Sequence, residues 1–482
     1  MKNLDKYEVV IGLEVHAQLL TKSKLFSGDS IAFGAAPNTQ VSPISLAHPG
    51  TLPVMNKEVM NLAIRLGLAL NCDIARNHYF ARKNYFYPDL PKGYQVSQHT
   101  TPICNKGFLE VQVGDAVKTV HLHHIHMEED AGKSIHDMDE DYTFIDLNRA
   151  GTPLLEIVTE PCIHSSDEAF AFLTALRRLV RWMDVCDGNM EEGSMRCDAN
   201  ISIRPKGETK LGTRVEVKNL NSIRNVKRAI DAEVQRLVSI VENGEEVIQQ
   251  TRSFDADKGT TFSLRNKEEA DDYRYFPEPD LPAFFISDEQ LHQVRRTMPL
   301  GPQQTEQLFK NKYALSQYDA AVICSDKDDA KFYSDLVAET SHYKAAANWM
   351  LGPLKAYCNE QQISFGEISI TPVQIASLIN FTESGAVSFS IASTRLLQAM
   401  LSNGYIEPHQ LATQMNLLQE SDTSLIESWV KQALESMPDK VKEYRSGKKG
   451  LIGLFAGQVK KISKGKADMQ QATKILEQQL NQ

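Results

Sequence analysis

Alternation of apolar and polar residues, repeated in segments far apart in the chain, is the feature that most constrains the fold. Residues 7–19 place apolar side chains at every second position and put Glu14 and His16 on the opposite face of an extended chain. Residues 197–204 and 213–219 repeat the pattern, again with charged side chains on one face. A single such strand commonly has a solvated polar face. The repetition instead predicts an antiparallel sheet whose apolar face is covered and whose other face carries charge.

A second constraint is the stretch from His126 to Ser134, which contains three consecutive carboxylates and ends in Gly-Lys-Ser. As a strand, it places His126 and Glu128 on one face and Met127 on the other. The Gly-Lys-Ser does not complete a phosphate-binding loop, because that motif requires glycine at position 127. The stretch therefore predicts an acidic site for a hard cation, with Lys133 close enough to meet phosphate.

Glu156 is a candidate partner for this site. It lies within an otherwise apolar strand, residues 153–158, where an unpaired buried carboxylate would cost on the order of several kcal/mol. Carboxylates with one imidazole suit Mg²⁺, which can bridge nucleotide phosphates. The expected metal ligands are Glu14, His16, Glu128, Glu156 and Asp198. The cations expected to meet the phosphates are Arg82, Lys83, Lys133, Arg149 and Arg196.

The segment from Arg82 to Tyr94 has two interpretations. Two cations lie beside three aromatic residues, including Tyr85, and two prolines restrict the backbone. Such a surface can bind phosphates and stack single-stranded bases. It is equally consistent with a stiff loop whose tyrosines pack on the core, and both interpretations stay open.

The length of 482 residues predicts about three domains. Helices are expected over residues 57–70, from Ser165 to 183, and over 223–242, the second opened by a capping box with Glu168. From about residue 298 the pattern is helical, and a second break falls near Glu407 and Pro408. We therefore predict an α+β chain with an antiparallel-sheet domain over 1–296, an all-α domain over 297–408 and a small all-α tail over 409–482.

The tail contains a basic patch that the net charge of −10 conceals. Glycines between the lysines let backbone amides approach a phosphate closely, so RNA contact is the favoured interpretation over a merely solvated face. The candidate RNA-binding lysines are Lys448, Lys449, Lys460, Lys461 and Lys464.

Several classes of protein are disfavoured. The chain shows no expected signal peptide or bilayer-spanning apolar run, and its seven scattered cysteines include no Cys-x-x-Cys pair, which favours a reducing cytoplasm. No dinucleotide-binding Gly-x-Gly-x-x-Gly, Gly-x-Ser-x-Gly elbow or serine-rich amidase signature is present.

Long motifs resemble one family, the B subunits of the aspartyl/glutamyl-tRNA amidotransferases, or GatB, in its bacterial form. The resemblance spans nearly the whole chain. The segments that carry it are residues 11–16, 82–98, 126–134, 148–158, 188–200 and 273–282.

The resemblance implies a glutamine-synthetase-like cradle domain, a helical domain and a tail that contacts tRNA. It implies a heterotrimer with an amidase (the A subunit) and a small C subunit, in which misacylated Glu-tRNA(Gln) or Asp-tRNA(Asn) is amidated at the expense of ATP and glutamine. By position, Glu14, His16, Glu128 and Glu156 match the family's magnesium site, and Lys83 and Tyr85 match the motif beside the acyl-tRNA terminus. Many relatives carry a Cys-Pro-x-Cys zinc knuckle where this chain has Ser42-Pro43-Ile44-Ser45, so no zinc is expected.

The expected activity is that of an ATP-dependent carbon–nitrogen ligase with glutamine as amido donor. Glu128, Lys83 and Lys133 are the expected catalytic residues, and Arg82, Arg149 and Arg196 are expected to bind the nucleotide. Because the chain shows no glutaminase nucleophile, a partner has to supply ammonia. Two rivals stay open: a tRNA-binding scaffold without catalysis, and a free-standing ligase for small carboxylates.

Overall fold

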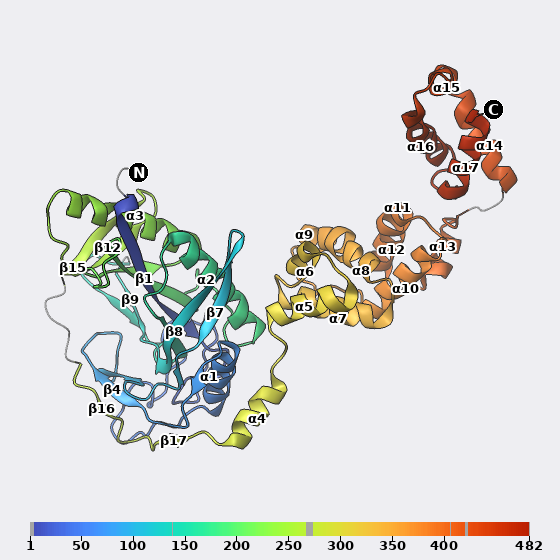
Figure 1. Ribbon diagram of the computed structural model, residues 1–482. Helices are drawn as coiled ribbons and strands as arrows, with labels where there is room; N and C mark the ends of the chain where they lie inside the picture. Colours follow the sequence, from blue (N-terminus) through green and yellow to red (C-terminus); the bar gives the residue numbers. More distant parts are fainter. Residues whose placement is uncertain (1–3, 137, 267–272, 405, 420–422, 482) are drawn as a thin grey trace. The chain divides into compact units, whose positions relative to one another are not determined.

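The computed structural model describes residues 4–136, 138–266, 273–404, 406–419 and 423–481 (Figure 1). The chain divides into two compact units, residues 1–301 and 302–482. The first contains the strands and the second is helical, which confirms the predicted order of a large, mainly antiparallel sheet followed by helices. The further division of the second unit at residue 408 stays a prediction.

The first unit is built on one large sheet. Within the described residues it has thirteen strands, whose main path runs β15-β14-β13-β12-β1-β11-β8-β5-β4-β16. Its pairs are antiparallel except for β13 with β14. The strands on that path are β1 (Tyr7–Gln18), β4 (Ala81–Asn84), β5 (Tyr94–Ser97), β8 (Ala116–Glu129), β11 (Pro153–Thr159), β12 (Met195–Pro205), β13 (Val215–Leu220), β14 (Gln250–Asp255), β15 (Thr260–Asn266) and β16 (Phe276–Pro277).

Short strands extend this sheet or pair apart from it. β2 (Asp73–Ile74), β6 (Cys104–Asn105) and β7 (Phe108–Val113) join it beside β8. Two separate pairs are β9 (Lys133–Ile135) with β10 (Phe144–Asp146), and β3 (Asn77–His78) with β17 (Phe284–Phe285). Neither of these two pairs belongs to the large sheet.

The alternation in the sequence is realised as two unlike faces. On β1, Leu13, Val15 and Ala17 are fully buried, while Glu14 and His16 on the other face are partly exposed. Helices α2 (Ser166–Trp182) and α3 (Ile223–Glu242) pack on each other, and α3 also packs on β12 and β13. The hydroxyl oxygens of Ser165 and Ser222 accept hydrogen bonds from backbone amides in the first turn of α2 and α3, respectively. These bonds fix where the two helices begin. Covering one face with helices leaves the opposite face to the charged residues.

Two further helices complete the first unit and confirm or extend the sequence pattern. α1 (Lys57–Ala69) agrees with the helix predicted over 57–70, and it packs against α4 (Asp288–Thr297). A short 3-10 turn, η1 (Leu4–Lys6), precedes β1. Among the described residues, no helix combines the length and the hydropathy needed to cross a membrane.

The second unit is helical throughout its described residues. Its helices are α5 (Pro302–Tyr313), α6 (Gln317–Ile323), α7 (Lys327–Glu339), α8 (Tyr343–Trp349), η2 (Met350–Leu354), α9 (Lys355–Gln361), α10 (Pro372–Glu383), α11 (Phe389–Ile391), η3 (Ala392–Leu396), α12 (Leu397–Asn403), α13 (Pro408–Gln414), α14 (Thr423–Glu435), α15 (Pro438–Arg445), η4 (Lys449–Leu451), α16 (Ile452–Ile462) and α17 (Met469–Asn481). A hydrophobic cluster draws its members from between Ile426 and Leu480, and it includes Phe455 and Val459 of α16, which are fully buried.

Candidate functional site

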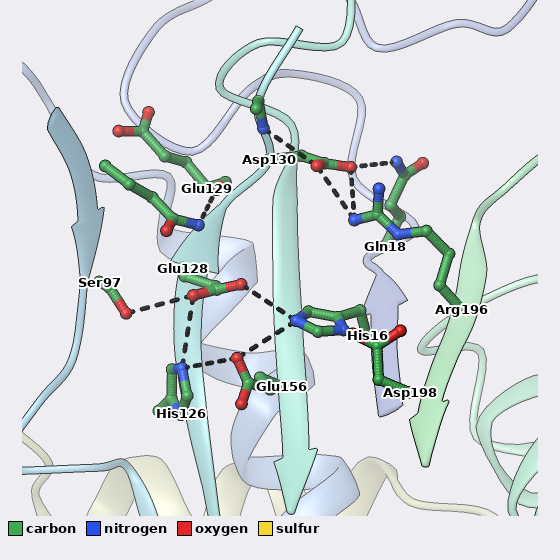
Figure 2. Close-up of polar contacts among 12 residues, drawn as sticks. His16, Gln18, Ser97, His126, Glu128, Glu129, Asp130, Glu156, Arg196 and Asp198 are labelled. Carbon is green, nitrogen blue, oxygen red and sulfur yellow. Dashed lines mark hydrogen bonds and ion pairs between the residues drawn. The ribbon is translucent and has the colours of Figure 1, made fainter. Parts of the chain in front are cut away.

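Strand register places a row of charged side chains across the middle of the polar face. Glu156 of β11 lies opposite His126 of β8 on one side and His16 of β1 on the other, and His16 lies opposite Arg196 of β12. Residues paired across antiparallel strands project on the same face, so these four side chains form one line. Figure 2 shows the two imidazoles on either side of the Glu156 carboxylate.

Glu128, two residues beyond His126 on β8, completes a compact cluster with this row. His16 Nε2 lies 3.2 Å from a Glu156 oxygen and 3.6 Å from a Glu128 oxygen. His126 Nε2 lies 3.4 Å from oxygens of the same two carboxylates, and the Ser97 hydroxyl donates to Glu128 at 3.3 Å. Glu128 is only 4% exposed. Each buried carboxylate therefore has two imidazoles within reach, which meets the requirement for a counter-charge that the sequence implied for Glu156.

The pKa values in the cluster follow from the contacts of the two imidazoles with the two carboxylates. Burial alone would lower the pKa of His126, but Glu156 and Glu128 outweigh it and raise that pKa to about 10. Burial would raise the pKa of Glu156, whereas His126 and His16 hold it well below its ordinary value. His126 is therefore held as the imidazolium and Glu156 as the carboxylate.

Glu14, Asp198 and Glu216 form a second, neighbouring cluster. Lys218 Nζ lies 2.8 Å from both Asp198 and Glu216, and the Asn200 amide donates to Glu14 at 2.8 Å. Burial, and then the charge of Glu156, raise the pKa of Glu14. The five expected metal ligands therefore fall into two neighbouring groups, and metal binding by either group stays a prediction. Residues two apart on a strand are about 6.8 Å apart along it, so Glu14 and Asp198 gather one row away from His16 and Glu156.

Both clusters have donor sets that fit a divalent cation. One ligand atom each from His16, Glu128 and Glu156 lie within 4.8 Å of one another, and the same holds for Glu14, Asp198 and Glu216. Oxygen-rich sets with at most one imidazole suit Mg²⁺. Of the two, the first is the better candidate, because Lys218 Nζ lies only 2.8 Å from two carboxylates of the second, whereas His126 lies 3.4 Å from the carboxylates of the first.

The candidate cations around the clusters differ in how many hydrogen bonds and ion pairs they already make within the protein. Arg82 makes a two-pronged ion pair with Glu278, and Arg149 donates to the backbone oxygens of Ala131 and Gly132 at 2.9 and 2.6 Å. Arg196 contacts the buried Asp130. Lys133 is exposed at the start of β9, so its catalytic role stays a prediction.

Lys83 and Tyr85 lie on the other flank of the cluster. Lys83 Nζ is 4.8 Å from the centre of the Tyr273 ring and 5.9 Å from that of Tyr85. Burial would lower the pKa of Lys83, but Glu128 raises it, so the ammonium stays charged beside the carboxylates. Tyr85 is half-buried, whereas Phe86 and Tyr87 are exposed, so these aromatic residues do not all pack on the core. Binding of phosphates or bases by this segment stays a prediction.

The lysines of the tail are exposed on its helices. Lys460 and Lys461 lie on α16, and Lys464 follows its end. Lys448 is paired with Glu443 at 3.0 Å, and Lys449 donates to Asn481 at 2.9 Å. The pair on α16 is thus the less engaged part of the basic patch.

The loop that carries Ser42 and Ser45 is held by oxygen atoms. The carboxylate of Asp29 accepts hydrogen bonds from the hydroxyl groups of Ser27 and Ser45 and from the Ser42 amide. These bonds hold the pKa of Asp29 below its ordinary value although burial opposes them. All seven cysteines are free thiols, and they lie elsewhere in the chain.

Four members of these arrangements were not among the expected site residues: His126, Asp130, Glu216 and Lys218. His126 and Glu216 carried a usable signal, because each lies on the polar face of an alternating strand. Lys218 follows the same alternation. Asp130 belonged to the acidic stretch 126–134, but its partners could not be predicted, since it comes just after the end of β8 and acquires them only through the fold.

Known proteins that resemble this chain all point to one family. The GatB/GatE catalytic domain family matches residues 9–292, and the GatB domain family matches residues 331–480. The B subunit of the aspartyl/glutamyl-tRNA(Asn/Gln) amidotransferase of Syntrophotalea carbinolica is 47% identical over 475 residues, covering 98% of this chain and 99% of the relative. The B subunits from Halorhodospira halophila and Thermodesulfovibrio yellowstonii are 47% identical over 478 residues and 45% identical over 463 residues. They cover 99% and 96% of this chain, and 99% and 97% of their own lengths.

Proposed function

The chain belongs to the GatB family, and from this premise we propose that it is the B subunit of a tRNA-dependent amidotransferase. It converts Glu-tRNA(Gln), Asp-tRNA(Asn) or both to the corresponding amides. The observation that carries the proposal is the cluster of His16, His126, Glu128 and Glu156, which lies in the region matched by the catalytic-domain family. We assign to this region the glutamine-synthetase-like cradle fold that the family resemblance implies, and its large, mainly antiparallel sheet supports that assignment.

The chemistry requires activation of an inert carboxylate. Ammonia cannot displace oxide from a side-chain carboxylate, so the γ-phosphoryl group of ATP is first transferred to one carboxylate oxygen. Ammonia then attacks the acyl phosphate, the carbon–oxygen bond to phosphate breaks, and inorganic phosphate and a proton leave. Phosphoryl transfer depends mainly on positioning and on spreading negative charge.

The residues of the polar face supply that positioning. Glu128 and Glu156, with His16, would hold Mg²⁺, which when bound supplies charge to neutralise the nucleotide phosphates. Lys83 places a second positive charge on the opposite flank, where it meets the acyl end of the substrate. The half-buried setting of these groups limits water, which would otherwise hydrolyse the acyl phosphate.

Partners complete the activity. An amidase, the A subunit, supplies ammonia from glutamine, and a small C subunit joins the two larger chains. The lysines of the tail, Lys460 and Lys461 foremost, contact the tRNA. We place the assembly in the cytoplasm, where free thiols such as those of this chain persist.

Glu128→Gln tests the proposal in the assembly with its partner chains. It keeps the shape of the side chain, removes a charge that the cluster needs, and is expected to abolish ATP cleavage stimulated by Glu-tRNA(Gln) while binding of that tRNA persists. Glu8→Gln is the matched control, because Glu8 lies on the same sheet and is paired with Arg204. Unchanged ATP cleavage in Glu128→Gln would refute catalysis at this site and leave the scaffold as the function. Turnover of small carboxylates without RNA would favour the free-standing ligase.

A further inference from the structure

Asp130 is a buried carboxylate that the proposed chemistry has not yet used. It follows the last residue of β8 and is 5% exposed. Its backbone is fixed to the neighbouring turn, because its amide donates to Thr152 at 2.8 Å and its carbonyl accepts from Gly151 at 2.9 Å. Its carboxylate accepts hydrogen bonds from the Gln18 amide at 2.8 Å, from the Ala131 backbone amide at 3.0 Å and from Arg196 Nη2, which lies 3.0 Å from each oxygen. Arg149 Nε lies farther away, 3.7 Å from one oxygen. Figure 2 shows these side chains directly above the histidine and glutamate cluster.

The contacts of Arg196 leave part of its guanidinium unused. Both hydrogen bonds to Asp130 come from one nitrogen, Nη2, and within the described residues Nε and Nη1 have no acceptor. The other two candidate arginines are more fully engaged. Arg149 donates hydrogen bonds from Nε and Nη2 to backbone oxygens, and Arg82 donates from the same two nitrogens to Glu278.

The position of Arg196 relates it to the cluster. It lies opposite His16 in the register of β1 and β12, and two residues from Asp198 on its own strand. Its charge opposes protonation of His16, and the charges of Glu128 and Asp198 act on it in turn. A phosphoryl group held beside Glu128 and Glu156 would therefore be attracted by the positive charge of the Arg196 guanidinium.

We propose that Asp130 is a positioning residue that holds one edge of the Arg196 guanidinium so that the other edge receives the transferring phosphoryl group of ATP. The inference rests on the proposed function and adds a residue to it. Arginine binds phosphate through a planar fork, and its long side chain has many rotamers, so an arginine fixed before the ligand arrives binds it more tightly. Asp130 fixes it through a rigid backbone turn and a third partner, Gln18.

The test is a double-mutant cycle on nucleotide affinity in the complete assembly. The variants are Asp130→Asn, Arg196→Gln and the pair together, and the ligands are a non-hydrolysable ATP analogue and ADP. We expect Asp130→Asn to weaken binding of the analogue roughly tenfold and of ADP by no more than about threefold. In the Arg196→Gln background, Asp130→Asn should have no further effect. Equal losses in both backgrounds would overturn the inference, because they would mean that Asp130 acts on the fold or through Arg149 rather than through Arg196.

Two further variants guard against a trivial result. Asp329→Asn removes another buried carboxylate with a cation partner, Lys355 at 2.7 Å, from the helical unit, and should leave the preference for the ATP analogue over ADP unchanged. Arg196→Lys keeps the positive charge beside Asp130 but removes the planar guanidinium that binds phosphate. This variant remains informative even if Asp130→Asn does not fold. We expect it to lose the preference for the analogue over ADP, and a retained preference would overturn the inference. Failure of the proposed function is detected separately, by persistent ATP cleavage in Glu128→Gln.

Discussion

Arg82 offers a sharp test of how far the structure changes the interpretation of a charged residue. The sequence predicts that Arg82 binds nucleotide phosphate. In the structure its Nε and Nη2 each lie 2.7 Å from an oxygen of Glu278, whose side chain is 1% exposed, and its guanidinium stacks 4.2 Å from the centre of the Tyr94 ring. Arg82→Met should therefore act mainly on stability.

The size of the effect follows from what is left behind. With Arg82 gone, Glu278 keeps one close donor, the Asp280 amide at 3.0 Å. Breaking a buried ion pair on one side costs about 3–5 kcal/mol, and because Arg82 is itself 19% exposed we expect about 3 kcal/mol. Unfolding entropy of about 2.1 cal/mol/K per residue over the first unit of 301 residues converts this to a fall in Tm of about 5 °C.

The assay is thermal and denaturant unfolding of a cycle of variants. Arg82→Met/Glu278→Leu removes the stranded charge and should recover to within about 1 kcal/mol of the parent. Arg204→Met breaks a more exposed pair with Glu8 on the same sheet and should lower Tm much less than Arg82→Met does. If Arg82→Met leaves Tm unchanged but raises KM for ATP tenfold, the reasoning fails and Arg82 is the phosphate ligand that the sequence suggested.

Three other predictions are independent of this pair. Lys24 is 1% exposed, and burial lowers its pKa to about 8. Because the pKa in the folded state lies below that in the unfolded state, the positive charge on Lys24 destabilises the folded protein below pH 8. This destabilisation fades as the pH rises toward 10.5. Lys24→Met should raise stability at pH 7 by up to about 3 kcal/mol in unfolding experiments, with the gain lost near pH 10.5; a pH-independent gain would refute this. Neutralising Lys460 and Lys461 should raise KM for acyl-tRNA, not for ATP, and lower the salt slope of tRNA affinity by about 1.4, so an unchanged slope would exclude phosphate contact. Mg²⁺ at about 100 times its Kd should stabilise the chain by about 2.7 kcal/mol in thermal unfolding, and Glu156→Gln should remove that increment; an equal increment in the variant would move the site elsewhere.

Much of the fold was predictable because the local patterns were strong. The helix predicted over 223–242 has those bounds, and β1, β8 and β12 present the faces that alternation assigned to them. The pairing of strands was not predictable, because period-two patterns say which face a residue takes but not which strand lies beside it. For this reason the sequence could not indicate that Glu14 gathers with Asp198 and Glu216, whereas His16 gathers with Glu128 and Glu156.

Because strand pairing was not predictable, the sequence also overestimated the number of arginines and lysines that are available to bind phosphate. A buried carboxylate has to be paired, and in this fold Glu278 and Asp130, both far in sequence from their partners, engage Arg82 and Arg196.

The two imidazoles of the first cluster meet the same need for Glu128 and Glu156, which are paired before any ligand arrives. A metal at this site would have to replace protons on nitrogen, since only a neutral imidazole can bind it. The sheet is therefore not held together by the metal, unlike a structural zinc site whose removal unfolds its domain. Removing divalent ions should accordingly abolish phosphoryl transfer while leaving a folded chain.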